Sequence, residues 1–444
     1  TAAFSLLNHA ADNRETWLSR FYEIGKEAVR PRKDGELFGF LFPFDGPNLL
    51  TKSLVTAGVD ITDTRSGQLV KFAQPYGAFA KAIFERQAYP DLKNENGDPI
   101  PPYDVTAHSM SLLVGVSFKE VFAPYRVQPT GTGYSADYGP CGNVDHRYSI
   151  YKSFVPSMDE GWTRWIFDKE KRHNCFGYSS SQNVEIGTAN LIDKYRFIIF
   201  PDQSPNQILN GYAKGSMPDE YTGGVGKEGV ENLRKFVEAG GTLVFLNRAS
   251  NFAIEQFNLP VRDVTKGLPR KDFFIPGSIL RTELDLTHPI AKGMPKESIA
   301  WFENSPAFEI IAGTDPAKGI ATNSPPCLGG VPEGRGGRSE NSLVSFAPAS
   351  YLPSCSTTPS AEAASTPPNQ VGEFKNVRII ARYPSDPKNV LLSGWALGAE
   401  KIAGKAALIE VTMGKGKIVL FGFRPQYRGQ SLATFPLLFN AIAN

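Results

Sequence analysis

The chain has 444 residues, of which 41% are hydrophobic and 21% are charged, and its formal net charge is +2. A chain of this length exceeds the size at which a single hydrophobic core stops growing, so we expect two or more domains. Lys and Arg are scattered among Asp and Glu without a basic stripe, which argues against a nucleic-acid partner. No apolar run approaches the roughly 20 residues that a membrane-spanning helix needs.

The first 32 residues are predicted to form a helical segment that docks on another surface. Apolar side chains recur at helical spacing between residues 2 and 30, including those of Phe4, Trp17 and Phe21. A helix with so apolar a face requires a partner surface, and one candidate partner is a domain upstream of this segment.

Residues 33–71 are predicted to form a small α/β unit. An apolar strand at 36–43 is followed by a helix that ends at Gly58 and by a second strand at 59–62. This βαβ order is typical of parallel sheets. Residues 72–147 are rich in Pro, Tyr and Gly and are predicted to be an irregular connecting region. Two short helices are expected there, at 76–86 and 105–115.

Residues 148–444 are predicted to form a larger α/β domain of the flavodoxin-like kind. Buried strands alternate with amphipathic helices, which favours a mostly parallel sheet covered on both faces. The strands are expected at 149–154, 197–201, 242–246, 276–287, 377–383, 407–412 and 418–423, and the helices at 159–171, 229–239, 251–257 and 432–443. Residues 315–374 are dominated by Gly, Pro, Ser, Thr and Ala and are predicted to be a long loop insertion.

Polar residues follow two neighbouring strands of this domain and form a candidate binding site. Asp202, Gln203 and Ser204 follow one strand, and Asn247 and Arg248 follow the next. Open α/β sheets bind ligands at the carboxyl ends of their strands. The alternative is that Asp202 and Ser204 cap a turn while Arg248 pairs with a carboxylate.

The strand exit near the C-terminus carries further polar residues, Arg424, Arg428 and Gln430. Arginine suits the recognition of carboxylates, so these side chains either line a pocket or fix the loop by bonding to backbone carbonyls. No G-x-S-x-G or G-x-C-x-G motif occurs, and no histidine has the spacing of a local zinc motif. We therefore expect neither a nucleophile nor a metal in this chain.

The four cysteines are Cys141, Cys175, Cys327 and Cys355. All four stand in loop-like sequence, which favours disulfides between Cys327 and Cys355 and between Cys141 and Cys175, with buried free thiols as the alternative. A zinc site formed by Cys141 and Cys175 with two histidines matches no known spacing. Disulfides would indicate an exported protein, in the periplasm or outside the cell.

Several segments resemble one protein family. FAQPYGAFAKAIFERQAYPD (72–91) and PPYDVTAHSMSLLVGV (101–116) resemble the region after the catalytic domain in large bacterial zinc carboxypeptidases of the carboxypeptidase A-like family. FPDQSPNQILNGYAKG (200–215), EAGGTLVFLNRAS (238–250) and FGFRPQYRGQSLATFPLLFNAI (421–442) resemble their C-terminal domain, which is similar to class I glutamine amidotransferases.

The resemblance implies a peptidase zinc only in an upstream domain, since no residue here matches its ligands. The turn that carries the amidotransferase cysteine corresponds to Asn247 or Arg248, so no catalytic residue is carried over. The leading hypothesis is a non-catalytic C-terminal region of a zinc-carboxypeptidase-like protein, with a docking, substrate-access or assembly role. The alternatives are a separate extracellular protein that binds ligands or its own copies as a homo-oligomer, and a hydrolase that uses the sheet edge near Ser204.

Overall fold

The structure is a computed structural model that describes residues 2–43, 48–103, 105–127, 147–174, 177–311 and 376–443. The four cysteines and the predicted insertion lie outside these residues, so both disulfides and the loop stay predictions. In the described ranges, no helix is long and apolar enough to cross a membrane.

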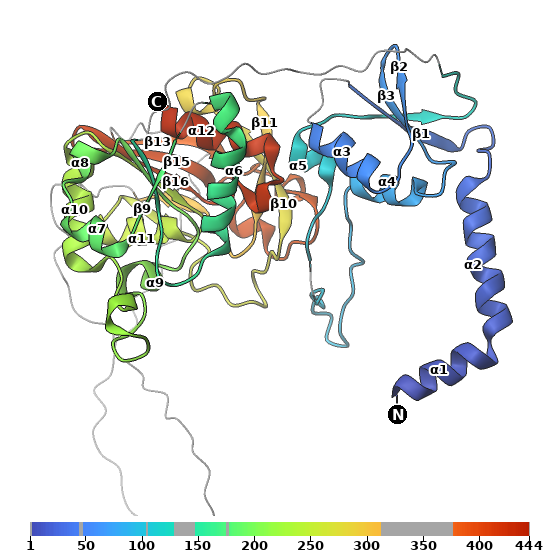
Figure 1. Cartoon of the computed structure of the whole chain (residues 1–444), viewed down its shortest axis with the longest axis horizontal. Helices are drawn as coiled ribbons and strands as arrows, with labels where there is room; N and C mark the ends of the chain where they lie inside the picture. The colour runs from blue at the N-terminus through green and yellow to red at the C-terminus, as the bar shows by residue number, and fades with distance from the viewer. Residues whose placement is uncertain are drawn as a thin grey trace, which may run out of the picture. The chain divides into compact units, whose positions relative to one another are not determined.

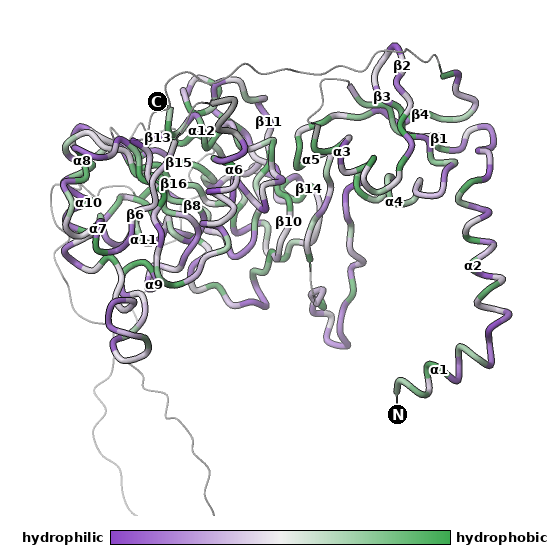
Figure 2. The backbone as a smooth tube through the Cα atoms, viewed as in Figure 1, coloured by the Kyte–Doolittle hydropathy of each residue, from purple (hydrophilic) through white to green (hydrophobic). Residues whose placement is uncertain are grey.

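The N-terminal segment forms two helices, α1 (Ala2–Asp12) and α2 (Arg14–Val29), where the sequence predicts one. They are separated at Asn13, whose side-chain amide donates to the carbonyl of His9 at 2.9 Å. No residue of either helix is buried: Phe4 is 72% exposed and Phe21 is 78% exposed. Figure 2 shows hydrophobic and hydrophilic residues mixed along both helices.

A small antiparallel sheet follows, with the strand order β2-β3-β1-β4. Its elements are β1 (Leu37–Phe42), α3 (Asn48–Thr56), β2 (Ile61–Thr64), β3 (Gly67–Lys71) and β4 (Lys119–Phe122). The strand–helix–strand order is as predicted, but the expected parallel pairing is not found, because β3 lies between β1 and β2. The turn at Arg65 and Ser66 folds β3 back on β2. Gly67 is required there, since a Cβ would lie 2.2 Å from the carbonyl oxygen of Phe42.

Part of the region predicted to be irregular joins this unit. Helices α4 (Gly77–Phe84) and α5 (Met110–Val114) contribute to the core under the sheet, and β4 pairs with β1. A buried polar cluster links this segment to a strand of the large sheet, β14 (Leu391–Ser393). The hydroxyls of Ser109 and Ser393 are 2.8 Å apart; the Ser109 hydroxyl lies 2.6 Å from the backbone carbonyl of Glu85, and the Ser393 hydroxyl lies 2.8 Å from the side-chain carbonyl of Gln87.

The large sheet has the strand order β11-β10-β13-β15-β16-β8-β7-β5-β6. Strands β16, β8, β7, β5 and β6 are parallel, while β11, β10, β13, β15 and β16 pair antiparallel. The sheet is therefore mixed, with the predicted parallel part on one side of β16. The strands are β5 (Tyr148–Tyr151), β6 (Ser179–Ser181), β7 (Phe197–Phe200), β8 (Thr242–Leu246), β9 (Val261–Asp263), β10 (Ser278–Leu284), β11 (Glu297–Phe302), β12 (Phe308–Ile310), β13 (Val377–Arg382), β14, β15 (Ala406–Met413) and β16 (Gly416–Phe421).

Helices cover both faces of the parallel part, as the alternating pattern predicts (Figure 1). One face packs against α6 (Met158–Asn174) and α12 (Phe435–Ala443). The other packs against α7 (Asn183–Thr188), α8 (Leu191–Lys194), α9 (Pro205–Asn210), α10 (Gly226–Glu238) and α11 (Ala249–Gln256). Two apolar layers thus hold the strand ends β5, β7, β8 and β16 in fixed register, and the candidate site lies at these ends.

Candidate functional site

The turn after β8 has the strand–turn–helix form on which α/β hydrolases carry a nucleophile, but it holds an asparagine. Asn247 has a left-handed backbone, with φ of 54°, and α11 begins two residues later. Asparagine tolerates this conformation better than most residues do. Its side chain is fully buried, and its amide nitrogen donates to Asp202 at 3.0 Å. The residue at the sharp turn therefore serves as a hydrogen-bond donor and is closed off from solvent.

Asp202, at the end of β7, is the centre of the site. It is 4% exposed and accepts hydrogen bonds from the backbone and the guanidinium of Arg248. The Arg248 Nη2 atom lies 2.6 Å from Asp202 Oδ2, and Nε lies 3.0 Å from Oδ1. This two-point contact matches the planar guanidinium to the carboxylate, and such pairs are strong and directional.

Arg424, just after β16, joins this pair to two further elements. It is 6% exposed and donates to Asp202 Oδ2 at 2.8 Å, to Asp159 Oδ1 at 3.0 Å and to the backbone carbonyl of Glu303 at 2.7 Å. Asp159 lies in the first turn of α6, and the Glu303 side chain, which is 43% exposed, has an oxygen 3.6 Å from Arg424. One buried guanidinium thus ties together α6, β7, β11 and β16.

Two buried carboxylates share this arginine, and their pKa values move in opposite directions. Burial raises the pKa of Asp159 to about 7, since the attraction of Arg424 offsets only part of the desolvation and Asp202 adds repulsion. Burial also acts on Asp202, but the hydrogen bonds from Arg248 and the charge of Arg424 outweigh it and lower the pKa of Asp202. Asp202 is therefore the ionised member of the pair, and Asp159 holds a proton up to near-neutral pH.

The other predicted site residues have roles outside the Asp202 network: Gln203 and Ser204 fix local backbone, and Arg428 and Gln430 are exposed. Ser204 is the N-cap of α9: its hydroxyl accepts from the backbone N–H of Gln207, and its own backbone N–H donates to the side-chain carbonyl of Gln207, which together form a capping box. Gln203 is buried and donates to the carbonyl of Val155 at 2.8 Å. Arg428 and Gln430 are exposed, and neither is among the partners of the Asp202 network in the described part of the chain.

The structure therefore brings Asp202, Asn247, Arg248 and Arg424 together and leaves Arg428 and Gln430 outside. Two members of the network, Asp159 and Glu303, are not predicted from the sequence. Asp159 stands next to Glu160 in the acidic first turn of α6, a position that predicts a helix start and gives no sign of burial. In the described ranges, no group of three His, Cys, Asp or Glu side chains is arranged to hold a metal.

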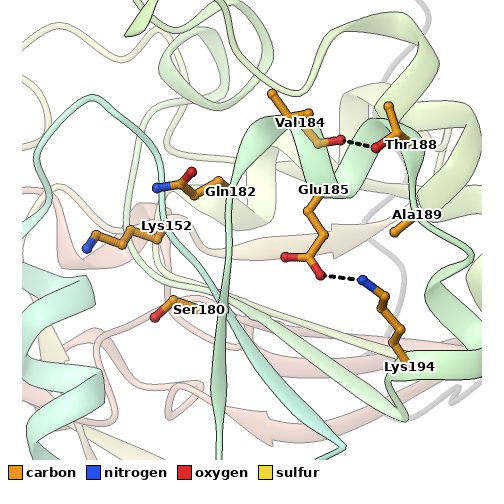
Figure 3. Close-up of a pocket in the computed structure, with 8 residues that line it drawn as sticks. All are labelled: Lys152, Ser180, Gln182, Val184, Glu185, Thr188, Ala189 and Lys194. Atoms are coloured by element: carbon orange, nitrogen blue, oxygen red, sulfur yellow. Dashed lines mark hydrogen bonds and ion pairs between the residues drawn. The ribbon is translucent and has the colours of Figure 1, made fainter. Parts of the chain in front are cut away.

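Beside this network, a pocket of about 250 Å³ opens between the loops that follow β5 and β7. Its lining residues are Tyr151, Lys152, Ser153, Phe154, Val155, Pro156, Ser157, Glu160, Pro201 and Gln203. A second, more open pocket of about 580 Å³ lies toward β6 and also includes Lys152 (Figure 3). In it, Lys194 pairs with Glu185 at 3.0 Å. At the carboxyl ends of the parallel strands, the Asp202–Arg248 pair therefore fills the space after β8, and a pocket is left after β5.

No protein-family model and no curated protein matches the chain. Among solved structures, a ThuA-like protein from Bacteroides uniformis aligns over 70% of this chain and 96% of its own, at 12% identity and a TM-score of 0.35. A GMP synthase protein from Thermoplasma acidophilum aligns over 67% and 96%, at 9% identity and a TM-score of 0.33. A β-galactosidase from Bacillus circulans aligns over 66% of this chain and 30% of its own, at 10% identity and a TM-score of 0.32. The α/β fold class itself rests on the strand order and pairing given above.

Proposed function

We propose that this chain is a non-catalytic docking region of a zinc-carboxypeptidase-like protein, and that α1 and α2 bind the peptidase domain. The observation that carries the proposal is the apolar surface of these two helices. Nine large apolar side chains on them are between 49% and 78% exposed: Phe4, Leu6, Leu7, Trp17, Leu18, Phe21, Tyr22, Ile24 and Val29. Exposure of this many large apolar side chains on two successive helices is typical of a surface that binds another protein.

The aromatic side chains in this set favour a protein partner. Trp17, Phe21 and Tyr22 all lie on α2. Aromatic side chains that become buried contribute much of the binding energy in protein interfaces. Burying one such side chain fully stabilises a complex by about 1.5–3 kcal/mol. The resemblance of residues 72–91 and 101–116 to the region after a carboxypeptidase catalytic domain supports that domain as the partner.

The strand ends support a role in binding and give no support to hydrolysis. The side chain at the sharp turn after β8 is an amide that bonds to Asp202, and the Ser204 hydroxyl is engaged in the cap of α9. None of the hydrogen bonds described for Ser204 involves a histidine. A serine without a base is a poor nucleophile at neutral pH.

Two results are expected: the gene encodes a zinc-peptidase domain, and that domain forms a complex with this chain. The gene must encode a zinc-peptidase domain with a His-x-x-Glu motif together with this chain, and its absence would refute the proposal. The purified peptidase domain should form a one-to-one complex with the full chain in sedimentation velocity. The double variant Phe21→Ser, Ile24→Ser should weaken that complex at least about tenfold.

The matched control is Arg20→Ser, Glu23→Ser, which changes two polar residues of the same helix. This control should bind like the unaltered chain, because hot spots of binding are aromatic and apolar anchors. Equal binding by the apolar variant would contradict the proposal. Loss of self-association in that variant, without any peptidase complex, would instead identify copies of this chain as the partner.

A further inference from the structure

The pocket between β5 and β7 lies at the topological switch point of the parallel strands. From β5 the chain crosses to β6 on one side, and from β7 it proceeds to β8 on the other. The loops after β5 and β7 therefore diverge, and a crevice opens between their carboxyl ends. Ligands of open α/β sheets bind in crevices at this position. The pocket of about 250 Å³ lies there, outside the Asp202 network.

The walls of this pocket are held in place by hydrogen bonds. The Gln203 amide donates to the carbonyl of Val155 at 2.8 Å, and the Ser157 hydroxyl donates to the carbonyl of Asp202 at 3.0 Å. The Ser153 hydroxyl accepts from the backbone N–H of Val155 at 3.1 Å. Both loops are thus cross-linked to each other, and a preformed pocket loses little conformational entropy when a ligand binds.

The charges of the lining residues indicate the sign of the ligand. Glu160 is neutralised by Arg164, whose Nε atom lies 2.6 Å from Glu160 Oε1. Lys152 has an exposed side chain and makes no ion pair with the described residues. Figure 3 shows its amine directed away from the Glu185–Lys194 pair. A ligand in this pocket therefore meets one uncompensated positive charge.

The size and lining of the pocket narrow the ligand class further. Phe154, Val155 and Pro201 provide apolar wall, and the Phe154 ring packs edge-on against Tyr221 with centroids 5.4 Å apart. The volume falls below the roughly 300–1,000 Å³ of pockets for drug-sized molecules. Lys152 supplies one positive charge among the lining residues, which matches the single charge of a carboxylate.

We propose that this pocket binds a small organic carboxylate, with the carboxylate on Lys152 and an apolar body against Phe154. This site is independent of the docking helices and goes beyond the docking role. The probe is hippurate, an aromatic carboxylate with one amide, and its neutral counterpart hippuramide is the matched ligand. Both are titrated into the full chain by isothermal calorimetry.

The chain should bind hippurate at least about tenfold more tightly than hippuramide, which corresponds to about 1.4 kcal/mol. Lys152→Met should reduce hippurate binding to the level of hippuramide, and Lys152→Arg should restore the preference. The control Lys194→Met removes a lysine from the neighbouring pocket and should bind like the unaltered chain. Equal affinity for the two probes, no saturable binding up to about 10 mM, or binding that depends on Lys194 would each overturn the proposal.

Discussion

Replacing Asp159 by asparagine tests the electrostatics of the buried network most directly. The amide keeps the size of the carboxyl and keeps an oxygen for the Nε atom of Arg424, which lies 3.0 Å from Asp159 Oδ1. It removes the titrating proton. We expect the variant to be more stable than the unaltered chain above neutral pH, because burial disfavours the charged form of Asp159.

The magnitude follows from the pKa of Asp159. This pKa is about 7 in the folded chain and about 3.9 for an unfolded aspartate. Between these values the folded chain holds a proton that the unfolded chain has lost. The free energy of unfolding therefore falls by about 1.4 kcal/mol for each unit of rising pH, and by about 4 kcal/mol over the whole window. The contribution is constant below about pH 4 and above about pH 7.

Urea unfolding followed by tryptophan fluorescence at pH 5, 6, 7 and 8 measures this difference. Relative to Asp159→Asn, the unaltered chain should lose about 2 kcal/mol of unfolding free energy between pH 5 and 7 and well under about 1 kcal/mol from 7 to 8. Asp219→Asn changes an exposed aspartate and controls for other effects of the substitution. A difference that stays constant with pH, or grows in favour of Asp159 as pH rises, would show that Arg424 keeps Asp159 ionised and would refute the reasoning.

Three further substitutions test the site and the core by urea unfolding at pH 7. Arg424→Met should destabilise the chain by about 3–5 kcal/mol, since it leaves Asp202 and Asp159 buried with fewer partners. A cost below about 1 kcal/mol would mean that Arg424 does not hold α6, β7, β11 and β16 together. Ser204→Ala should cost about 1 kcal/mol through the lost cap of α9, and an unchanged midpoint would mean that the capping box contributes nothing. Leu438→Ala should cost about 2–5 kcal/mol, because Leu438 is fully buried beneath the sheet; a smaller cost would mean that the α12 contact repacks.

The parts of the fold that depend on local pattern could be predicted from the sequence. Strands β7 and β8 are continuous apolar runs, and α10 has one apolar face and ends beside Gly240, which has a positive φ of 119°. The position of β3 between β1 and β2 could not be predicted, because pairing order depends on contacts across the sheet. Helices α7 to α9 are four to six residues long, too short for a periodic signal.

The candidate site was predictable only where strand ends bring residues together. Asp202, Asn247 and Arg248 follow adjacent parallel strands. The carboxyl ends of parallel strands lie at one edge of the sheet, so these residues lie close together. Arg424 follows the next strand along the sheet, β16, and joins them. Arg428 has a positive φ of 49°, and the turn it makes leaves its own side chain and that of Gln430 exposed. Asp159 comes from a helix start, and its burial depends on packing that the sequence does not display.

The hydroxyl cluster of Ser109 and Ser393 has a consequence for how the molecule unfolds. These two residues are fully buried, and together with Gln87 they bond across 284 positions of the sequence. Separating the two elements would leave the Ser393 hydroxyl without its Gln87 and Ser109 partners, at about 1–3 kcal/mol, while Ser109 keeps the backbone carbonyl of Glu85. We therefore expect loss of this contact to loosen β14 as well, which hydrogen exchange would detect as a shared opening of the two elements. A substitution that destabilises the smaller sheet should therefore also lower the stability of β14 in the larger one.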